Sequence, residues 1–327
     1  MSALVEINDL TKYFDIGQDQ IVHAVDGVSL SINSKEVVGL VGESGSGKST
    51  LGKAVLGLHD KTSGNVSFAG QVLPQKYRSK DFQSRAQQMQ MIFQDPYSSL
   101  NPRMTVGEII GEGLKLNKDI DVEEISQRVD HWLSLVGLSA EHKSRYPHEF
   151  SGGQRQRIGI ARALILEPDF VVCDEPISAL DVSVQAQVVN LLAELKESMG
   201  LTLLFIAHDL SMVRYISDRM AVMYLGGLVE VGDADDVFFD PLHPYTKTLI
   251  ASNPEADPES ERQRVSTTIQ GEIPSPVNIP AGCRFANRCP EAMSICHGTT
   301  PTLKKPSAAM VGNESKENRR VACHLFD

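Results

Sequence analysis

The sequence predicts an α/β protein whose core is a largely parallel sheet covered by helices. Two runs, Val37–Gly42 and Phe170–Asp174, are apolar without alternation, as expected for strands buried on both faces. Stretches with a helical pattern follow such strands, which is typical of strand-then-helix units. The 327 residues, of which 41% are hydrophobic and 22% charged, suffice for a large core and exceed the usual size of one domain.

The remaining elements are predicted in chain order. Short β-like runs occur at 4–7, 21–24 and 28–32. Helices are expected from Lys48 to about Leu58, within a helical insertion at about 103–146, at 154–166 and at Val182–Met199, before a strand at Leu201–Ala207. This order predicts one large domain over 1–252 with a helical subdomain at about 95–165, a Pro-, Ser- and Glu-rich linker at 253–280, and a cysteine-rich extension at 281–327.

Charge and hydropathy exclude several functional classes. The 31 Lys and Arg against 42 Asp and Glu give a net charge of −11, which argues against a general nucleic-acid surface. No apolar stretch approaches the ~18–20 residues of a membrane span. The N-terminus also lacks the apolar core of a secretory signal. We therefore expect a cytoplasmic chain that reaches a membrane only through a partner.

A glycine-rich turn joins the strand at Val37–Gly42 to the next helix. It fits the pattern G-x-x-x-x-G-K-[ST], in which backbone N–H groups and a helix N-terminus surround phosphates. Lys48 is expected at the β- and γ-phosphates, and Ser49 on Mg²⁺. A turn without a ligand is the alternative, which the strand–turn–helix context disfavours. Such a loop alone fits GTPases, kinases, helicases and transport ATPases, and its predicted phosphate-binding residues are Gly42, Ser44, Gly45, Ser46, Gly47, Lys48, Ser49 and Thr50.

Two acids end the second buried strand. Burying them is costly unless they meet a metal or a polar ligand. Asp174 suits a water-mediated Mg²⁺ site and Glu175 suits polarising the attacking water. The alternative is a strand that runs into a charged turn. Cys173 is interpreted as a small core residue.

The segment Phe150-Ser151-Gly152-Gly153-Gln154 opens a helix and offers a second anion-binding N-terminus. With it, residues 4–250 resemble the ABC ATPases. The resemblance implies an ABC-type P-loop ATPase fold with a parallel-sheet core, an N-terminal antiparallel β subdomain and a helical subdomain. It also implies that this signature caps the γ-phosphate bound by a second ATPase subunit.

Other positions match the family in order. Gln94 resembles the Q-loop residue that senses Mg²⁺, Asp181 lies in the D-loop that communicates across the dimer, and His208 resembles the switch histidine at the γ-phosphate. Phe14, or its neighbour Tyr13, occupies the position whose ring stacks on adenine. The resemblance thus implies catalytic roles for Glu175, His208 and Gln94, and Mg²⁺ binding by Ser49, Gln94 and Asp174. The signature departs from the family at Phe150, where Leu is commoner, and Ile177 stands where Thr is frequent; neither change removes a chemical group.

A narrower resemblance rests on VDGVSL, GLVGESGSGKST, MIFQDPYSSLNPRMTV and HPYTKTLIAS, together with the cysteine-rich tail. These segments look like the oligopeptide/dipeptide (peptide/nickel) importer family. The resemblance implies a peripheral subunit at the cytoplasmic face of the plasma membrane. Its partners would be a paralogous ATPase, two permease subunits and, indirectly, an extracytoplasmic substrate-binding protein. Peptides, nickel complexes and oligosaccharides all stay open as cargo.

Four cysteines gather in the tail with the spacing C-x5-C-x6-C-x26-C: Cys283, Cys289, Cys296 and Cys323. In a cytosolic chain such a cluster indicates a metal before disulfides. The resemblance implies a [4Fe–4S] cluster, which four thiolates suit. Zinc, or no metal, is the alternative, although zinc sites more often use tighter cysteine pairs. His297 and His324 are further candidate ligands.

Two rival functions start from the same ATPase core. A chromosome-maintenance or DNA-repair ATPase would carry long coiled coils between the Q-loop and the signature, but Gln94 and Ser151 are only 57 positions apart. The acidic balance disfavours it as well. An iron–sulfur assembly or regulatory module is the second rival, and co-purification with membrane proteins would separate it from a transporter subunit.

Overall fold

The computed structural model describes residues 3–116, 120–252, 274–307 and 318–327. The chain divides into two units. The first comprises 33–36 and 77–206, and the second comprises 2–32, 37–76 and 207–327. The predicted linker at 253–280 lies largely outside the described residues, and its described part, 274–280, carries no helix or strand.

The first unit contains a parallel set of strands with a group of helices. Cα partners such as Met89 with Phe170, and Phe170 with Thr202, align the three strands in parallel. The β7 and β8 strands are buried at every residue, which explains their non-alternating sequences. The strands are β6 (Met89–Ile92), β7 (Phe170–Asp174) and β8 (Thr202–Ile206).

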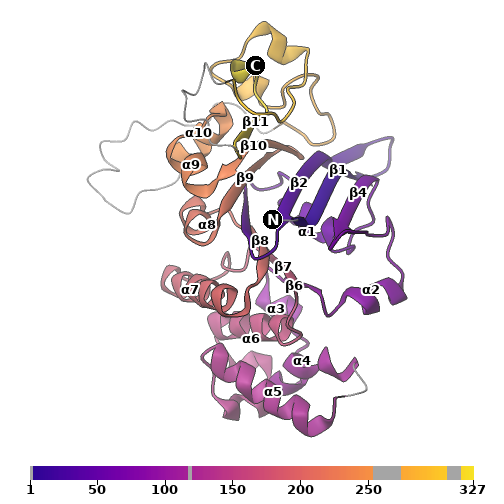
Figure 1. Cartoon of the computed structure of the whole chain (residues 1–327), viewed down its shortest axis with the longest axis vertical. Helices are drawn as coiled ribbons and strands as arrows, with labels where there is room; N and C mark the ends of the chain where they lie inside the picture. Colours follow the sequence, from indigo (N-terminus) through magenta and orange to yellow (C-terminus); the bar gives the residue numbers. More distant parts are fainter. Residues whose placement is uncertain (1–2, 117–119, 253–273, 308–317) are drawn as a thin grey trace, which may run out of the picture. The chain divides into compact units, whose positions relative to one another are not determined.

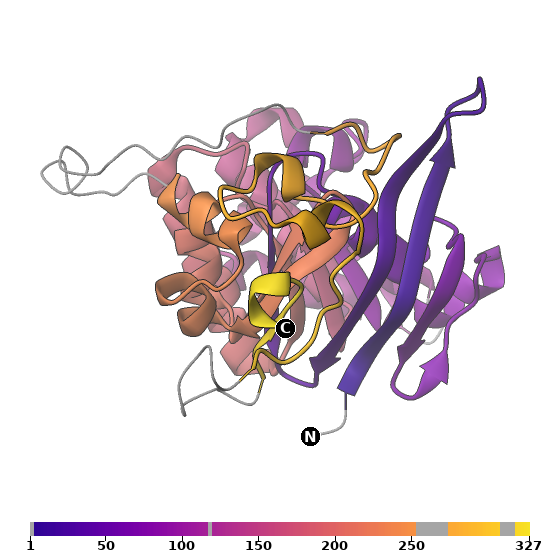
Figure 2. The same cartoon turned by 90° about the horizontal axis from the view of Figure 1, so that it is seen from above.

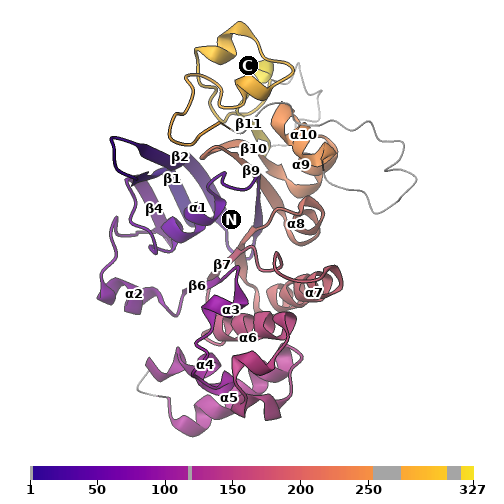
Figure 3. The same cartoon turned by 180° about the vertical axis from the view of Figure 1, so that it is seen from behind.

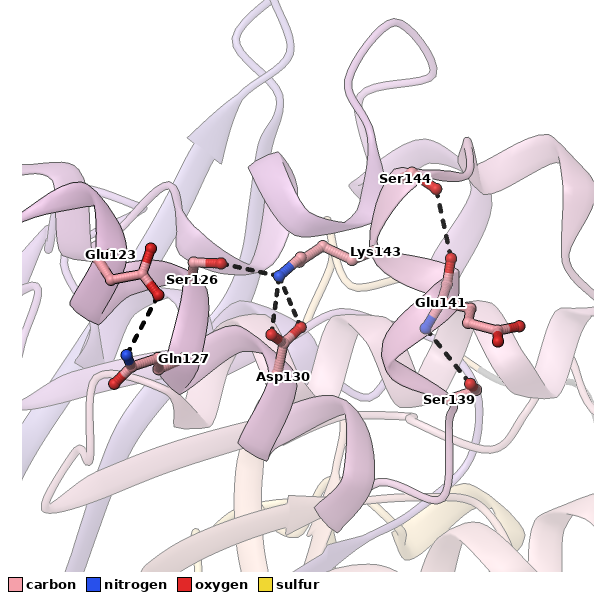
Figure 4. Close-up of polar contacts among 8 residues, drawn as sticks. All are labelled: Glu123, Ser126, Gln127, Asp130, Ser139, Glu141, Lys143 and Ser144. Carbon is pink, nitrogen blue, oxygen red and sulfur yellow. Dashed lines mark hydrogen bonds and ion pairs between the residues drawn. The ribbon is translucent and has the colours of Figure 1, made fainter.

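Helix α6 contacts α3, α4, α5 and α7 in this unit. The α4, α5 and α6 helices are seen together in Figure 1. A polar cluster joins the turn η2 to α5: the Lys143 ammonium donates to Ser126 and Asp130, each at 2.8 Å (Figure 4). The helices are α2 (Ser79–Arg85), α3 (Pro96–Ser99), α4 (Val106–Gly111), η1 (Leu114–Leu116), α5 (Val122–Leu135), η2 (Ala140–Ser144), η3 (Pro147–Glu149), α6 (Gly152–Leu164) and α7 (Val182–Met199).

The second unit contains an antiparallel sheet in the order β2-β1-β4-β5. Figure 2 shows the long β1 and β2 ribbons running beside each other, and Figures 1 and 3 show β4 next to β1. Val5 and Ile7 of β1 are buried and alternate with exposed Glu6 and Asn8, so one face packs on the core. These strands are β1 (Ala3–Asp15), β2 (Ile21–Asn33), β4 (Ser63–Phe68) and β5 (Gln71–Val72).

The same unit also holds a mixed set of strands with its own helices. The β3 strand pairs in parallel with β9, while β10 is antiparallel to both β9 and β11. These strands are β3 (Val37–Val41), β9 (Arg219–Tyr224), β10 (Gly227–Asp233) and β11 (Arg320–Val321). The helices are α1 (Lys48–Val55), α8 (Leu210–Ile216), α9 (Ala234–Phe239), α10 (Pro244–Ala251), η4 (Ala286–Arg288), η5 (Ser294–His297) and η6 (His324–Phe326).

Several elements differ from the sequence predictions. The two runs at 21–24 and 28–32 belong to one strand, β2. Gly27 adopts a positive φ of 71°, which glycine tolerates, and the strand continues through it. Helix α1 ends at Val55 rather than near Leu58, since Gly57 turns into the left-handed region. Strands β4, β5, β6, β9, β10 and β11 were not predicted. In the part of the chain that the structure describes, no helix is both long and apolar enough to cross a membrane.

Candidate functional site

The turn from β3 into α1 forms the predicted phosphate loop. Gly47 has φ 103°, and a Cβ added there would lie 1.9 Å from the carbonyl oxygen of Ala24. A Cβ on Gly42 would lie 2.1 Å from the carbonyl oxygen of Met223, so two of the loop glycines are required by close approach of backbone. Gly45, by contrast, faces open space. The loop is therefore packed at its two ends and open in its middle.

Lys48 is 4% exposed and begins helix α1. Its ammonium donates to the carbonyl oxygens of Gly42 at 2.8 Å and Glu43 at 2.9 Å, so the lysine is held over its own loop. The first turn of α1 carries no acidic residue, which leaves the positive end of the helix dipole available to an anion. Ser46 is buried, Ser49 and Thr50 are half-buried, and Ser44 is exposed.

Glu175 follows β7 directly and contacts the predicted Q-loop residue. The Gln94 side-chain amide donates to the Glu175 carboxylate at 2.8 Å, which brings two predicted catalytic residues together. Glu175 has φ 45°, a left-handed conformation that costs about 1–3 kcal/mol and persists at functional sites. Its backbone N–H donates to Ile206 of β8 at 2.9 Å, and its carbonyl accepts from Ser178. The acid is therefore fixed by the strands beside it.

Asp174 and Cys173 occupy the buried end of β7. Asp174 is 2% exposed, and a carboxylate buried in this way is costly unless it meets a cation or a polar partner. Burial raises the pKa of Cys173 to about 12, so this thiol is inert. Its interpretation as a core residue agrees with its complete burial.

The predicted signature caps helix α6 in the first unit. The Ser151 hydroxyl accepts from the Gln154 N–H at 3.4 Å, and the Gln154 side chain accepts from the Ser151 N–H at 3.0 Å, a reciprocal capping box. A Cβ on Gly153 would lie 2.4 Å from Val184 of α7, so this glycine is required for helix packing. Gly152 has more room, with Leu180 at 3.5 Å. Ser151 is exposed at the start of a 13-residue helix without an acid in its first turn.

The remaining predicted residues lie in loops and on β1. Asp181 is exposed at the N-cap of α7. His208 is exposed between β8 and α8 and belongs to the second unit. Tyr13 and Phe14 of β1 are both half-buried, and they make different contacts. The Tyr13 hydroxyl donates to Asp26 at 2.5 Å, while the Phe14 ring meets His59 edge-on at 5.4 Å between centroids.

In the extension, the charges of neighbouring cysteines contribute to the raised pKa values of Cys283, Cys289 and Cys323. The pKa of Cys323 is raised to about 11, chiefly by burial and in smaller part by the charges of Cys283, Cys289 and Cys296. Burial also raises the pKa of Cys283 and of Cys289. Both ring nitrogens of His324 are engaged, by Asp327 and by the carbonyl of Thr299 at 2.9 Å each, which leaves it a poor ligand. Among the described residues, no three His, Cys, Asp or Glu side chains are arranged to hold a single metal ion.

Sequence reasoning missed an ion pair between the loop and the extension. Arg288 of η4 donates to both carboxylate oxygens of Glu43, at 2.9 and 3.0 Å, within the second unit. Tyr245, from the motif HPYTKTLIAS, accepts from the Glu43 N–H at 2.8 Å. Because 245 positions separate the paired charges, no local pattern could have indicated them.

Comparisons with known proteins agree with these features. A family model described as "ABC transporter" matches residues 25–178, and one described as "Oligopeptide/dipeptide transporter, C-terminal region" matches 229–296. The chain is 52% identical over 324 residues to the putative oligopeptide transport ATP-binding protein YkfD of Bacillus subtilis, covering 99% of this chain and 95% of YkfD. It is 50% identical over 311 residues to the oligopeptide transport ATP-binding protein OppF of Salmonella typhimurium, covering 92% and 93%.

Solved structures resemble the fold as well. One is the dimeric ATP-binding cassette MJ0796 in a post-hydrolysis state bound to ADP and Pi. It matches with a TM-score of 0.65 and 28% sequence identity, over 70% of this chain and 98% of the cassette. Another, cbiO1 of Clostridium perfringens, also has a TM-score of 0.65 at 28% identity, over 73% of this chain and 92% of its own.

Proposed function

Because the chain belongs to the ABC transporter family, with the C-terminal region of its oligopeptide/dipeptide branch, we propose that it hydrolyses ATP to drive peptide import through membrane permease subunits. The contact of Gln94 with Glu175 at the end of a buried strand carries this proposal, in a chain that also has a complete phosphate loop. Peptides are the proposed cargo because the relatives are named as oligopeptide transport proteins. Nickel complexes and oligosaccharides are the alternative cargoes.

Each part of the site has a proposed role. The loop Gly42–Thr50 cradles the phosphates, with Lys48 leaving its carbonyl partners for the β- and γ-oxygens, and Phe14 stacks on the adenine. Glu175 polarises the attacking water and His208 contacts the γ-phosphate. Ser49, Gln94 and Asp174 would hold Mg²⁺, which neutralises phosphate charge when bound.

Phe14 is preferred over Tyr13 for the adenine because the Tyr13 ring is already committed. That ring lies 4.2 Å from the ring of His23, and its hydroxyl is bonded to Asp26. The Phe14 ring has its face near the Lys12 ammonium, 4.6 Å from the centroid. Phe14 has no polar group that could fix its ring by a hydrogen bond, whereas the Tyr13 hydroxyl fixes that ring on Asp26.

The signature completes a site on a second subunit. Ser151, Gly152, Gly153 and Gln154 would meet the γ-phosphate bound by the partner, and Asp181 would communicate between the two. The exposed N-terminus of a long helix without first-turn acids supports this role. We propose a paralogous ATPase as the partner, two permease subunits in the membrane and, indirectly, an extracytoplasmic substrate-binding protein. The chain would then be peripheral at the cytoplasmic face of the membrane, without nucleic acid.

The test of the ATPase assignment is Glu175→Gln in the assembled transporter. The variant should bind ATP but lose about 10²–10⁴-fold in turnover, the usual contribution of a positioned base. Glu167→Gln is a matched control, because Glu167 is an exposed glutamate in the same unit that also has a positive φ, 51°. A Glu175→Gln variant that hydrolyses ATP at the wild-type rate would show that another group is the base.

For the four cysteines we propose a [4Fe–4S] cluster, for which Cys283, Cys289, Cys296 and Cys323 would supply the four thiolates. Zinc would instead require four ligands around one atom, with sulfurs at about 2.3 Å. The spacing C-x5-C-x6-C-x26-C, wider than the tight cysteine pairs of most zinc sites, is what favours the cluster over zinc in this proposal.

The cluster is tested by spectroscopy and metal analysis of the purified full-length chain. A visible absorption band that bleaches with dithionite, together with iron in the sample, is expected. Cys289→Ser should abolish the band, whereas Cys173→Ser, in the buried β7, should retain it. Zinc without iron would overturn the cluster.

A further inference from the structure

Glu43, the second residue of the phosphate loop, forms a salt bridge with the cysteine-bearing extension (residues 281–307 and 318–327). Arg288 meets its carboxylate with two nearly equal hydrogen bonds, the bidentate arrangement that fixes both partners in orientation. The side chains are only 5% and 17% exposed, so water screens this pair little. Such a pair costs much to break, because one charge would stay buried without its partner.

The backbone of Glu43 is held as well. Its N–H donates to the Tyr245 hydroxyl, and Tyr245 is fully buried. The Tyr224 hydroxyl accepts from Arg288 at 3.1 Å. The rings of Tyr224, Tyr245 and Phe285 pack with centroids 4.6–5.4 Å apart. Phe285 and Arg288 both come from the extension, so this segment supplies the charge that holds Glu43 and part of the aromatic packing around it.

The residue held in this way in turn holds the phosphate-binding lysine. The Glu43 carbonyl accepts from the Lys48 ammonium, which is the group expected at the β- and γ-phosphates. A change in the position of Glu43 therefore changes the starting position of Lys48 and the shape of the loop between them. The contacts run from Arg288 to Glu43 and from Glu43 to Lys48 without a gap.

A second arginine of the extension reaches the other end of the proposed ATP site. Arg284 donates to the Asp26 carboxylate at 2.8 Å and to the carbonyl of Leu225. Asp26 also accepts from Tyr13, the neighbour of Phe14. The extension thus contacts both the phosphate loop and β2, whose Asp26 is bonded to the neighbour of the proposed adenine-stacking residue.

We propose that Arg288 is a positioning residue for ATP: it fixes Glu43 and, through it, the phosphate loop, so that the extension sets the ATP affinity of its own chain. This inference rests on the proposed ATPase function. It assigns the extension a role in nucleotide binding that depends on the arginine between Cys283 and Cys289, whatever the four thiols hold.

The test measures ATP binding by the full-length chain with a fluorescent ATP analogue, alongside the unfolding temperature without nucleotide. Arg288→Met should weaken ATP binding about tenfold, the scale of one charged hydrogen-bonded pair. Arg288→Lys should recover part of the loss, because lysine keeps the charge without the two-pronged geometry. Glu43→Gln should resemble Arg288→Met, and the double variant should be no worse than either single one, because both remove the same interaction.

Arg319→Met is the matched control. It breaks a similarly buried arginine–glutamate pair in the same unit, and Arg319 itself donates to Glu230 and Asp240 rather than to the loop. It should lower the unfolding temperature and leave the ATP affinity of the folded protein unchanged. In the assembled transporter, Arg288→Met should raise KM for ATP more than it lowers kcat.

The outcomes separate this inference from the function on which it rests. Wild-type protein that binds no ATP would contradict the proposed function itself. Wild-type binding with equal affinity in Arg288→Met would overturn the positioning role, and so would an equal loss in Arg319→Met. If Arg288→Met does not fold, Arg288→Lys and Glu43→Gln decide the matter: unchanged ATP affinity in both would overturn the inference.

Discussion

The phosphate loop and the cysteine-bearing extension are both held by close contacts, but the origins of those contacts differ. The loop lies between β3 and α1, and its lysine is bound by carbonyls five and six positions away. The extension is bound to the rest of the unit by arginines whose acidic partners lie 89 to 258 positions away. A local turn can be recognised as a motif, whereas the extension is understood only through its distant partners.

A glycine pair in the loop gives the largest expected effect. In Gly47→Ala the new Cβ would meet the carbonyl of Ala24 at 1.9 Å, at a φ of 103°. We expect the free energy of unfolding to fall by more than about 4 kcal/mol, in the range reserved for severe steric conflict. Gly45→Ala is the control: it has no heavy atom within 4 Å, and only its positive φ, worth about 1–2 kcal/mol, should act. Urea denaturation measures the free energy of unfolding of both variants. Equal decreases would show that close contact with Ala24 does not require glycine at position 47.

The buried pair of the tail gives the next largest effect. Arg319 donates to Glu230, which is 0% exposed and also accepts from the N–H groups of Leu242 and His243. Arg319→Met should lower the free energy of unfolding by about 3 kcal/mol, because it leaves that carboxylate without its cation. The neighbouring Arg320 is exposed, so Arg320→Met should change it by less than about 0.5 kcal/mol. If the two variants were alike in denaturation experiments, the tail would not be anchored by this pair.

Acid should loosen the junction between β10 and α10 through His243. Burial lowers the pKa of His243 to about 3, below its ordinary value of 6.5. As pH falls from 6.5 towards 3, the unfolded chain takes up a proton that the folded chain does not. The stability is therefore full above pH 6.5 and declines by up to about 1.4 kcal/mol per pH unit below it.

This decline is measured as the difference in pH dependence between wild type and His243→Asn. The asparagine oxygen can replace Nδ1, which accepts from the Tyr245 N–H at 3.0 Å, but it does not titrate. His131→Asn, at an exposed position of α5, should keep the wild-type dependence. The same slope in His243→Asn as in wild type would assign the acid sensitivity to other groups.

The contrast between local and distant contacts also explains which parts of the fold the sequence could predict. Strands β3 and β7 were predicted, because a short apolar run bounded by turns indicates burial on both faces. The β2 strand was divided in two, because Asp26 and Gly27 resemble a turn while the strand in fact continues through them. Strands β9 and β10 were missed although their residues are apolar, since only pairing with β3 and β11 defines them.

The same difference between local and distant contacts decides which parts of the candidate site could be predicted. The loop, the acids after β7 and the helix cap at Ser151 are each contained within a few consecutive residues. The contact of Gln94 with Glu175 spans 81 positions, and only a resemblance to a known family brought these two residues into one site. Arg288 and Tyr245 belong to no motif of the loop, and physical contact alone reveals them.

The smallest expected effect comes from an exposed ion pair in the helical part of the first unit. It tests whether the ATP affinity depends on the extension in particular. The Lys143 and Asp130 side chains are 35% and 39% exposed, so water competes for their charges. Lys143→Ala should lower the free energy of unfolding by at most about 1 kcal/mol, as for other exposed ion pairs. It should leave the ATP affinity of the chain unchanged, because neither residue belongs to the loop or to the extension. A loss of ATP affinity as large as that expected of Arg288→Met would mean that the loop responds to any disturbance of the chain, and the distinction between the extension and the rest of the molecule would fail.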